Sequence, residues 1–248
     1  MITIKSAQQI EKMRASARIT REALLLLEKH IKPGVTTAQL NKIAHDFILS
    51  KGAKPNFLNY GGFPASICTS VNDVVVHGIP EKRRVLQEGD IISVDMGAVL
   101  DGFHSDAART FPVGKISPAA QRLIDVTKES FFKGIDNLKH GAKLGDVSFA
   151  IQSFVEDNGY SVVRDLVGHG IGRELHEDPS VPNFGKAGKG VKLAAGMTLA
   201  IEPMVNAGGY EVSVLDDDWT VVTDDGSLSA HYENTVLITK DGYEILTL

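Results

Sequence analysis

GDIISVDMGAVLDGFHSDAART, residues 89 to 110, is the stretch that decides the fold. Its nearly continuous apolar run from 91 to 100 is typical of a strand buried on both faces, yet it carries Asp95 in its middle. The pair Asp101-Gly102 predicts a two-residue hairpin turn. A turn at 100-101 places Asp106 opposite Asp95, and a turn at 101-102 places it diagonally. Either register puts both carboxylates on one face of the hairpin.

Two buried carboxylates at this separation repel each other, and burial raises the cost. They are therefore expected to share either a proton or a cation. The alternative is that Asp106 points to solvent while Asp95 accepts backbone hydrogen bonds. The hairpin alone leaves both interpretations open.

The composition indicates an ordinary globular protein rather than a nucleic-acid binder. It has 248 residues, 43% of them apolar, with a net charge of -5 and a pI near 5.9. Cys68 is the only cysteine, which excludes an internal disulfide and favours a reducing compartment. No apolar run approaches the length of a membrane span, and no signal-peptide core opens the chain. We expect a cytoplasmic protein.

Capping residues and apolar spacing predict four helices and a series of strands. The first helix runs from the N-cap Ser6 to about His30, and the second from Thr36-Thr37 to about Ser50. Strands are expected between 66 and 79, with a turn at Asn72-Asp73. After the 89 to 110 hairpin, helices are expected from Ser117-Pro118 to about Lys139 and from Leu144 to about Asp157, and strands follow to the end.

The helix, helix, strands order occurs twice, and a shift of 107 residues aligns the two copies. The shift sets the strand GDIISVD, 89 to 95, on GMTLAIE, 196 to 202, so that a carboxylate recurs at the same place in the same apolar strand. We therefore expect one domain, 1 to 248, made of duplicated halves at about 1-115 and 116-248. The matched positions are Lys32 with Lys139, Gly34 with Gly141, Phe47 with Phe154, Gly52 with Gly159, Gly89 with Gly196, Asp95 with Glu202 and, after a slip in register, His77 with His169.

A pseudo-twofold arrangement of these halves predicts a metal site. It brings Asp95 and Glu202 to the axis, and Glu233 opens a late apolar strand that can face Asp106. Each residue taken singly has a structural interpretation. Glu202 could be an ion-paired glutamate in the core, His169 a hydrogen-bonded histidine in a glycine-rich turn, and Glu233 a surface charge at a strand edge. Four carboxylates and an imidazole together favour Mn(II), Fe(II), Co(II) or Zn(II), and bridging carboxylates suit two ions ~3.5 to 4 Å apart.

The motifs VVVHGIP, ISVDMGAVLDGFHSDAART, GHGIGRELHEDP, LAIEPMV and HYENTVLIT, in this order, resemble those of the type I methionine aminopeptidases in their bacterial form. The resemblance covers essentially the whole chain. It implies an α+β, pita-bread fold: two pseudo-symmetric halves of curved antiparallel sheet backed by helices. It also implies removal of the N-terminal methionine from nascent proteins and peptides, with a preference for a small second residue.

The resemblance assigns roles to individual residues. Two divalent ions would be held by Asp95, Asp106, His169, Glu202 and Glu233, with Asp106 and Glu233 bridging. A metal-bridging hydroxide would attack the scissile carbonyl with Glu202 as general base, and His77 and His176 would hydrogen-bond the substrate.

The resemblance also assigns binding positions. The methionine side chain would lie against Tyr60, Phe63, Cys68 and Trp219, a soft and aromatic wall suited to a thioether. Leu175 stands where the family commonly has phenylalanine, which puts the details of this wall in question. A monovalent cation would bind the backbone carbonyls around Asn72, Val74 and Ser229.

Two alternatives stay open from the sequence. Another pita-bread peptidase, such as a proline-specific aminopeptidase, generally carries an additional N-terminal domain for which this chain has no room. A catalytically dead relative that binds protein or RNA typically loses metal ligands, and all five are present here. We expect a monomer, transient proximity to the ribosome, and no direct contact with nucleic acid or membrane.

Overall fold

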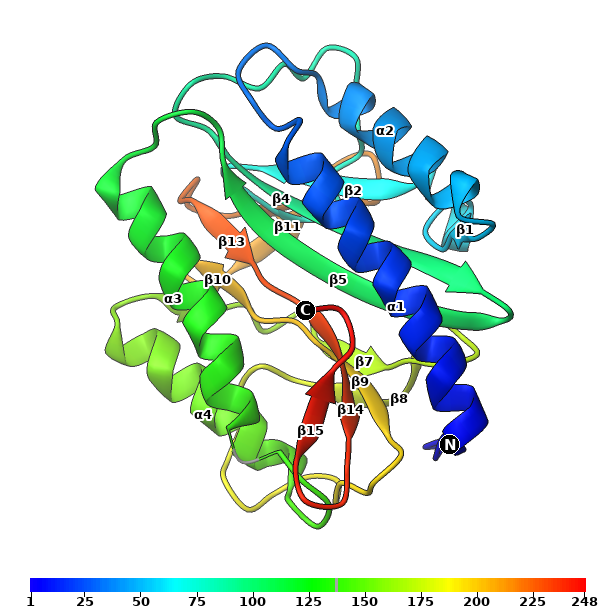
Figure 1. Cartoon of the computed structure of the whole chain (residues 1–248). Coiled ribbons are helices and arrows are strands. Elements are labelled where there is room, and N and C mark those ends of the chain that lie inside the picture. The colour runs from blue at the N-terminus through cyan, green and yellow to red at the C-terminus, as the bar shows by residue number, and fades with distance from the viewer. Residues whose placement is uncertain (137) are drawn as a thin grey trace.

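The computed structural model describes residues 1 to 136 and 138 to 248, and its helices and strands form two halves (Figure 1). The first half contains helices α1 (Ala7–Glu28) and α2 (Thr37–Ser50), and the second contains α3 (Pro118–Ile135) and α4 (Leu144–Asp157). In Figure 1, α1 lies in front of the β4–β5 hairpin and α3 lies in front of the strands of the second half. Helices packed on antiparallel sheets confirm the expected α+β class.

The first-half strands surround one long hairpin. Strand β4 (Ile91–Leu100) pairs with β5 (Phe103–Pro112), with β2 (Ile67–Val71) and with the short β1 (Lys54–Pro55). Strand β3 (Val74–Val76) instead joins the sheet of β11 (Val212–Val214) and β12 (Val221–Thr223), which belong to the second half of the sequence. The two halves therefore share a sheet.

The second-half strands form two sheets. The larger has the order β15 (Tyr243–Ile245), β14 (Asn234–Ile238), β9 (Thr198–Ile201), β7 (Gly168–Gly170) and β8 (Glu177–Val181). The smaller has the order β13 (Ser229–His231), β10 (Met204–Asn206) and β6 (Ser161–Val162), and a 3-10 turn, η1 (Tyr60–Gly62), lies in the first half. All these pairings are antiparallel.

Local sequence signals set the helix ends. Ser6 and Thr36 each cap a helix through a capping box, in which the cap amide donates to the side-chain oxygen of a glutamine three residues later, Gln9 or Gln39. Helices α2 and α4 agree with the expected ranges. Helix α3 ends at Ile135 rather than near Lys139. The expected continuation crosses residue 137, which lies outside the described part of the chain.

Each half has its own hydrophobic core. Buried residues of α1 and α2, such as Leu27 and Leu40, pack against the inner face of β4 at Ile92 and Val94. In the second half, α3 and α4 pack against β9 and β14 in a separate cluster. Two further clusters contain buried residues of both halves and join the halves where they meet.

The 107-residue spacing recurs in the backbone. The amide of Gly34 donates to Leu86, and the amide of Gly141 donates to Leu193, both at 2.8 Å. Isolated bridges link Thr36 with Val85 and Lys143 with Lys192, again 107 residues apart. Both Gly34 and Gly141 adopt a φ of +89°, where a side chain is strained. These matched contacts support an internal duplication, which we retain as a hypothesis.

No helix in the described residues combines the length and the apolar character needed to cross a bilayer.

Candidate metal centre and substrate cavity

The β4–β5 hairpin fixes the first pair of carboxylates. Asp101 and Gly102 form the loop with φ values of +50° and +74°, as a primed two-residue turn requires. Asp106 then pairs with Gly97, and Asp95 pairs with Ala108, so the two aspartates lie diagonally on one face. Asp106 is only 3% exposed, so the interpretation that it points to solvent is wrong.

Strands β9 and β14 fix the second pair. Glu202 directly follows β9 and Glu233 directly precedes β14, one position beyond the last paired residues, Ile201 and Asn234. Glu233 is 2% exposed, so it is not a strand-edge surface charge. Its amide donates to the Ala108 carbonyl at 3.0 Å, which brings β5 of one half beside β14 of the other.

A side chain completes this junction between the halves. The Thr235 hydroxyl accepts from the Asp106 amide and donates to the Asp106 carbonyl, both at 2.9 Å. The backbone on both sides of the carboxylates is therefore held by hydrogen bonds that do not use the carboxylate oxygens.

His169 comes from β7, where glycine on either side permits close strand packing. A Cβ on Gly168 would lie 2.3 Å from the Ala200 carbonyl oxygen, closer than any real contact. The Nδ1 atom of His169 lies 2.8 Å from the Gly170 carbonyl, which can only accept, so Nδ1 carries the proton. The unprotonated Nε2 consequently faces the carboxylates, 3.7 Å from Glu202 Oε1 and 4.0 Å from Asp106 Oδ2. This is the tautomer that a metal ligand needs.

The electrostatics of the cluster are dominated by burial. Burial raises the pKa of Asp95 to about 7 and the pKa of Glu202 to about 8, and it raises the pKa values of Asp106 and Glu233 well above the usual range. For Asp106 and Glu233, the neighbouring carboxylates raise the pKa further. Burial lowers the pKa of His169 to about 3, which keeps the imidazole neutral. Ionised carboxylates are costly here without a cation.

The donor set fits divalent metal ions. Atoms of Asp106, His169 and Glu233 that can bind a cation lie within 4.8 Å of one another. The buried oxygens Asp95 Oδ1, Asp106 Oδ1 and Glu233 Oε1 have no hydrogen-bond partner in the described part of the molecule. Buried polar atoms are normally satisfied, so converging oxygens without partners form a donor set that a divalent cation could satisfy.

One cavity of about 190 Å³ gathers every catalytic, metal-binding and methionine-binding residue expected from the sequence. The wall is aromatic, since Phe63 meets Trp219 edge to face at 5.1 Å and Trp219 meets His77 at 6.4 Å. Leu175 is 1% exposed and Cys68 is 3% exposed. The lining residues are Phe57, Tyr60, Gly61, Phe63, Cys68, His77, Asp95, Asp106, His169, Leu175, His176, Glu202, Trp219 and Glu233.

His231 was missed by the sequence analysis. Its Nε2 atom lies 3.6 Å from Glu202 Oε2 and, within the described residues, has no hydrogen-bond partner. The two oxygens of Glu202 thus face different imidazoles, Oε1 towards His169 and Oε2 towards His231. One signal in the sequence was available. His231 lies two residues before Glu233 in an extended segment, and this spacing places both side chains on one face.

Arg109 was also missed. Its guanidinium donates to the backbone carbonyl of Glu233 and, at 2.7 Å, to Asn234 Oδ1, while it lies 4.3 Å from the centre of the Tyr232 ring. Arg109 therefore fixes the start of β14, directly after Glu233. No spacing rule in the sequence points to this contact across 124 residues.

The residues expected at a monovalent site lie apart from the cavity. The Ser229 amide donates to the Asn72 carbonyl at 2.9 Å, so these two positions are adjacent. Val74 lies in the neighbouring strand, paired with Val222. Asn72 adopts a φ of +59° and its side chain bonds Asp90 and Ile91.

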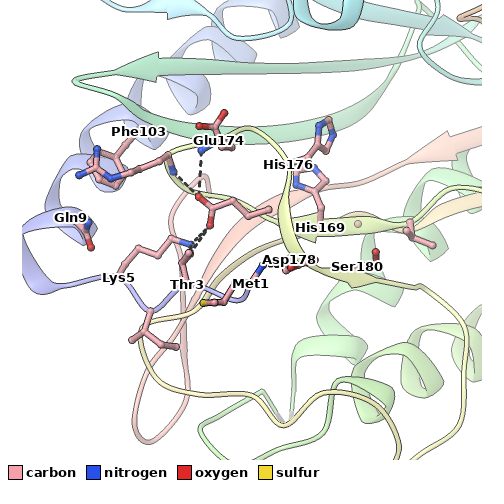
Figure 2. Close-up of a pocket in the computed structure, with 15 residues that line it drawn as sticks. Met1, Thr3, Lys5, Gln9, Phe103, His169, Glu174, His176, Asp178 and Ser180 are labelled. Atoms are coloured by element: carbon pink, nitrogen blue, oxygen red, sulfur yellow. Dashed lines mark hydrogen bonds and ion pairs between the residues drawn. The ribbon is translucent and has the colours of Figure 1, made fainter.

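A wider cavity of about 1010 Å³ adjoins the first, and His169 and His176 line both (Figure 2). The wider cavity lies between the N-terminal segment and the loop that leads into β8. Its wall contains a buried ion pair, Lys5 Nζ to Glu177 Oε2 at 2.7 Å, and the Met1 ammonium pairs with Asp178. The two cavities thus share two histidines, and charged groups lie in the wall of the wider one.

Comparison with known proteins decides the family. The model of metallopeptidase family M24 matches residues 11 to 240. A methionine aminopeptidase of Clostridium acetobutylicum is 61% identical over 100% of this chain and 99% of the relative, and methionine aminopeptidase 1 of Bacillus subtilis is 51% identical over the same shares. The chain belongs to metallopeptidase family M24.

The M24 assignment agrees with the structure. A crystal structure of methionine aminopeptidase from Rickettsia prowazekii superimposes with a TM-score of 0.98 at 48% identity, covering 100% of both chains. The resemblance to methionine aminopeptidases and the pita-bread M24 fold expected from the motifs are thereby confirmed.

The buried carboxylates predict an unusual pH dependence for the metal-free protein. Above about pH 6.5 its free energy of unfolding should fall, by about 1 to 3 kcal/mol up to pH 8.5. The folded-state pKa values of Asp95 and Glu202 exceed their unfolded values near 4, so the folded state binds more protons and is destabilised as they leave. Below about pH 6.5 His169, with its lowered pKa, acts in the opposite direction, which sets the window.

Urea unfolding of the metal-free protein at pH 6.5, 7.5 and 8.5 measures this dependence. Glu202→Gln removes one titrating group and should flatten the curve, whereas Glu81→Gln, an exposed control, should leave it unchanged. A metal-free protein whose stability rises through this window would contradict the assignment of raised carboxylate pKa values.

Proposed function

We propose that this chain is a dinuclear, metal-dependent methionine aminopeptidase that removes the N-terminal methionine from nascent proteins and peptides and prefers a small second residue. The observation that carries the proposal is the small cavity in which four buried or partly buried carboxylates and the unprotonated Nε2 of His169 meet a soft aromatic wall. The curated relatives at 45 to 61% identity over the whole chain are named methionine aminopeptidases, which supports the substrate.

The metal ligands in this proposal are Asp95, Asp106, His169, Glu202 and Glu233. Asp106 and Glu233 would be the bridging ligands, as the resemblance implies; both are deeply buried and each has an unpaired oxygen in the described structure. When bound, Co(II), Mn(II), Fe(II) or Zn(II) would supply an activated water and polarise the scissile carbonyl.

Glu202 acts as the general base and passes the proton to the leaving amine. Its side chain lines the same cavity as the other proposed ligands, so it lies beside the place where the scissile bond would be held. His176 and His77 donate hydrogen bonds to the substrate. Burial lowers the pKa of His77 to about 4, so it serves as a neutral donor and not as an acid.

The methionine side chain occupies the part of the cavity lined by Tyr60, Phe63, Cys68, Leu175 and Trp219. A buried thiol, a branched aliphatic side chain and aromatic rings form an apolar, polarizable wall that suits a thioether. Leu175 keeps the wall apolar without a flat ring. The limited volume of the cavity supports a small second residue, since both residues are held near the carboxylates.

The proposal also covers the compartment and the partners. The lone, buried Cys68 favours the reducing cytoplasm, and the net charge of -5 argues against direct nucleic-acid binding. We further propose that the protein is a monomer that meets nascent chains near the ribosome. A monovalent cation would bind the backbone carbonyls of Asn72, Val74 and Ser229.

Peptide cleavage tests the proposed function. The protein loaded with Co(II), Mn(II) or Fe(II) should release methionine from Met-Gly and Met-Ala peptides and far more slowly from Met-Leu, with no cleavage of Gly-Gly. Chelation should abolish release and added metal should restore it, because the five ligands have no chemical role without cations. Full methionine release by the metal-free protein, or equal cleavage of Gly-Gly, would overturn the proposal.

Glu202 and Asp95 should respond differently to substitution. Asp95→Asn should lose activity mainly through lost metal and recover part of it at high metal concentration, because Asp95 is assigned ligation alone. Glu202→Gln should lose at least about 100-fold in kcat and should not recover, because an amide cannot accept the proton. Methionine release is measured against titrated Mn(II), with bound metal counted in parallel. Wild-type turnover in Glu202→Gln with filled metal sites would show that another group is the base.

A further inference from the structure

Tyr60 contacts more than the methionine side chain. Its hydroxyl lies 2.7 Å from His176 Nδ1, and the two rings lie 5.1 Å apart. On its other side, His176 meets the ring of the metal-ligand candidate His169 at 4.2 Å, edge to face. His176 is thus held between a phenol and the proposed metal centre, with Nδ1 turned to the phenol.

The backbone presents Tyr60 rigidly. It begins the turn η1, where Asn59, Gly61 and Gly62 all have positive φ values of 64°, 56° and 96°. The Tyr60 amide donates to Phe57 and its carbonyl accepts from Phe63, both at 2.9 Å. A Cβ on Gly61 would lie 3.4 Å from the Trp219 ring, so the turn rests against the cavity wall.

Hydrogen-bond roles follow from the chemistry of the two groups. A phenol at neutral pH carries one proton, and burial with the nearby Glu174 raises the pKa of Tyr60 further. Tyr60 is 42% exposed, and its hydroxyl can donate to His176 Nδ1 across the 2.7 Å contact when that nitrogen is unprotonated. A neutral imidazole that accepts at Nδ1 carries its own proton on Nε2. Burial lowers the pKa of His176, which agrees with the neutral form.

We propose that Tyr60 is a positioning residue that holds His176 as the Nε2–H tautomer, so that His176 offers a hydrogen-bond donor to the substrate and has no free lone pair with which to act as a base. This rests on the proposed function only for its catalytic consequence. With its proton on Nε2 and its Nδ1 lone pair bonded to Tyr60, His176 is unable to replace Glu202 as the group that accepts the proton from water.

Nitrogen NMR tests the tautomer without reference to activity. Two-bond proton–nitrogen spectra of ¹⁵N-histidine-labelled, Zn(II)-loaded protein at pH 7.5 should show His176 with a protonated Nε2 and an unprotonated Nδ1. Tyr60→Phe keeps the ring but removes the hydroxyl, and His176 should then show both tautomers. Tyr243→Phe, which changes a half-exposed phenol on β15, is the matched control and should leave the His176 signals unchanged.

Kinetics test the consequence. Tyr60→Phe should lower kcat by up to about tenfold, the size of one hydrogen bond, while KM changes by less than about threefold because the aromatic wall is kept. In a His176→Ala background the same substitution should have little further effect, because the two residues act as one unit. An Nδ1-protonated His176 in the wild type, or Tyr60→Phe with unchanged tautomer and kcat, would overturn the proposal. A protein that keeps the Nε2–H signal but releases no methionine would refute the proposed function instead.

Discussion

Repulsion among four carboxylates in one small cavity is the constraint on which the rest of the structure depends. Asp106 and Glu233 are buried and Asp95 and Glu202 are partly buried, and desolvation raises the pKa of each. Without a cation they must hold protons, and with cations they can all ionise and bind. The four carboxylates therefore have to be held together by interactions of the backbone and of other side chains.

The backbone provides that restraint from both halves of the chain. The β4–β5 hairpin carries two carboxylates and the β9–β14 pair carries the other two. Thr235 and the Glu233 amide join the halves where the four meet. The helices of each half pack on a cluster of their own, and two further clusters contain residues of both halves, so hydrophobic contacts from both sides hold the junction where the carboxylates lie. Arg109 adds a cation that bonds the backbone of this junction and leaves the carboxylate oxygens free.

The imidazoles around the carboxylates have distinct environments. His169 donates Nδ1–H to a carbonyl and turns a lone pair to the centre, whereas His176 accepts at Nδ1 from a phenol and turns a donor to the cavity. His231 lies against the second oxygen of Glu202. The contacts of Nδ1 and Nε2 therefore decide whether each histidine is suited to bind metal, to donate a hydrogen bond to substrate or to support a neighbouring side chain.

Much of the fold was predictable because its signals are local. Capping glutamines mark the starts of α1 and α2, and the 107-residue shift places α4 on α2. The hairpin register was left open between two turns, and the structure selects 101-102 because Asp101 and Gly102 both adopt positive φ. The carboxylates were predictable from an acid inside an apolar strand and its recurrence at Glu202.

The remaining site residues could not be predicted because their contacts are not local. The Tyr60 hydroxyl meets His176 across 116 residues, and Arg109 reaches β14 across 124. The spacing of His231 from Glu233 indicates a shared face, but it does not show that His231 Nε2 lies beside Glu202. Such contacts depend on how the two halves are packed together, and neither residue spacing nor composition carries that information.

The most direct test of the account is the number of protons released when metal binds. Calorimetric titration of the metal-free protein with Mn(II) at pH 7, in two buffers of different ionisation enthalpy, measures that number. Carboxylates with raised pKa values must lose protons to bind cations, so the account predicts net release of at least about one proton per protein at saturation. Tight Mn(II) binding with no proton release would show that the cluster is already ionised without metal, and would contradict the constraint from which this account is built.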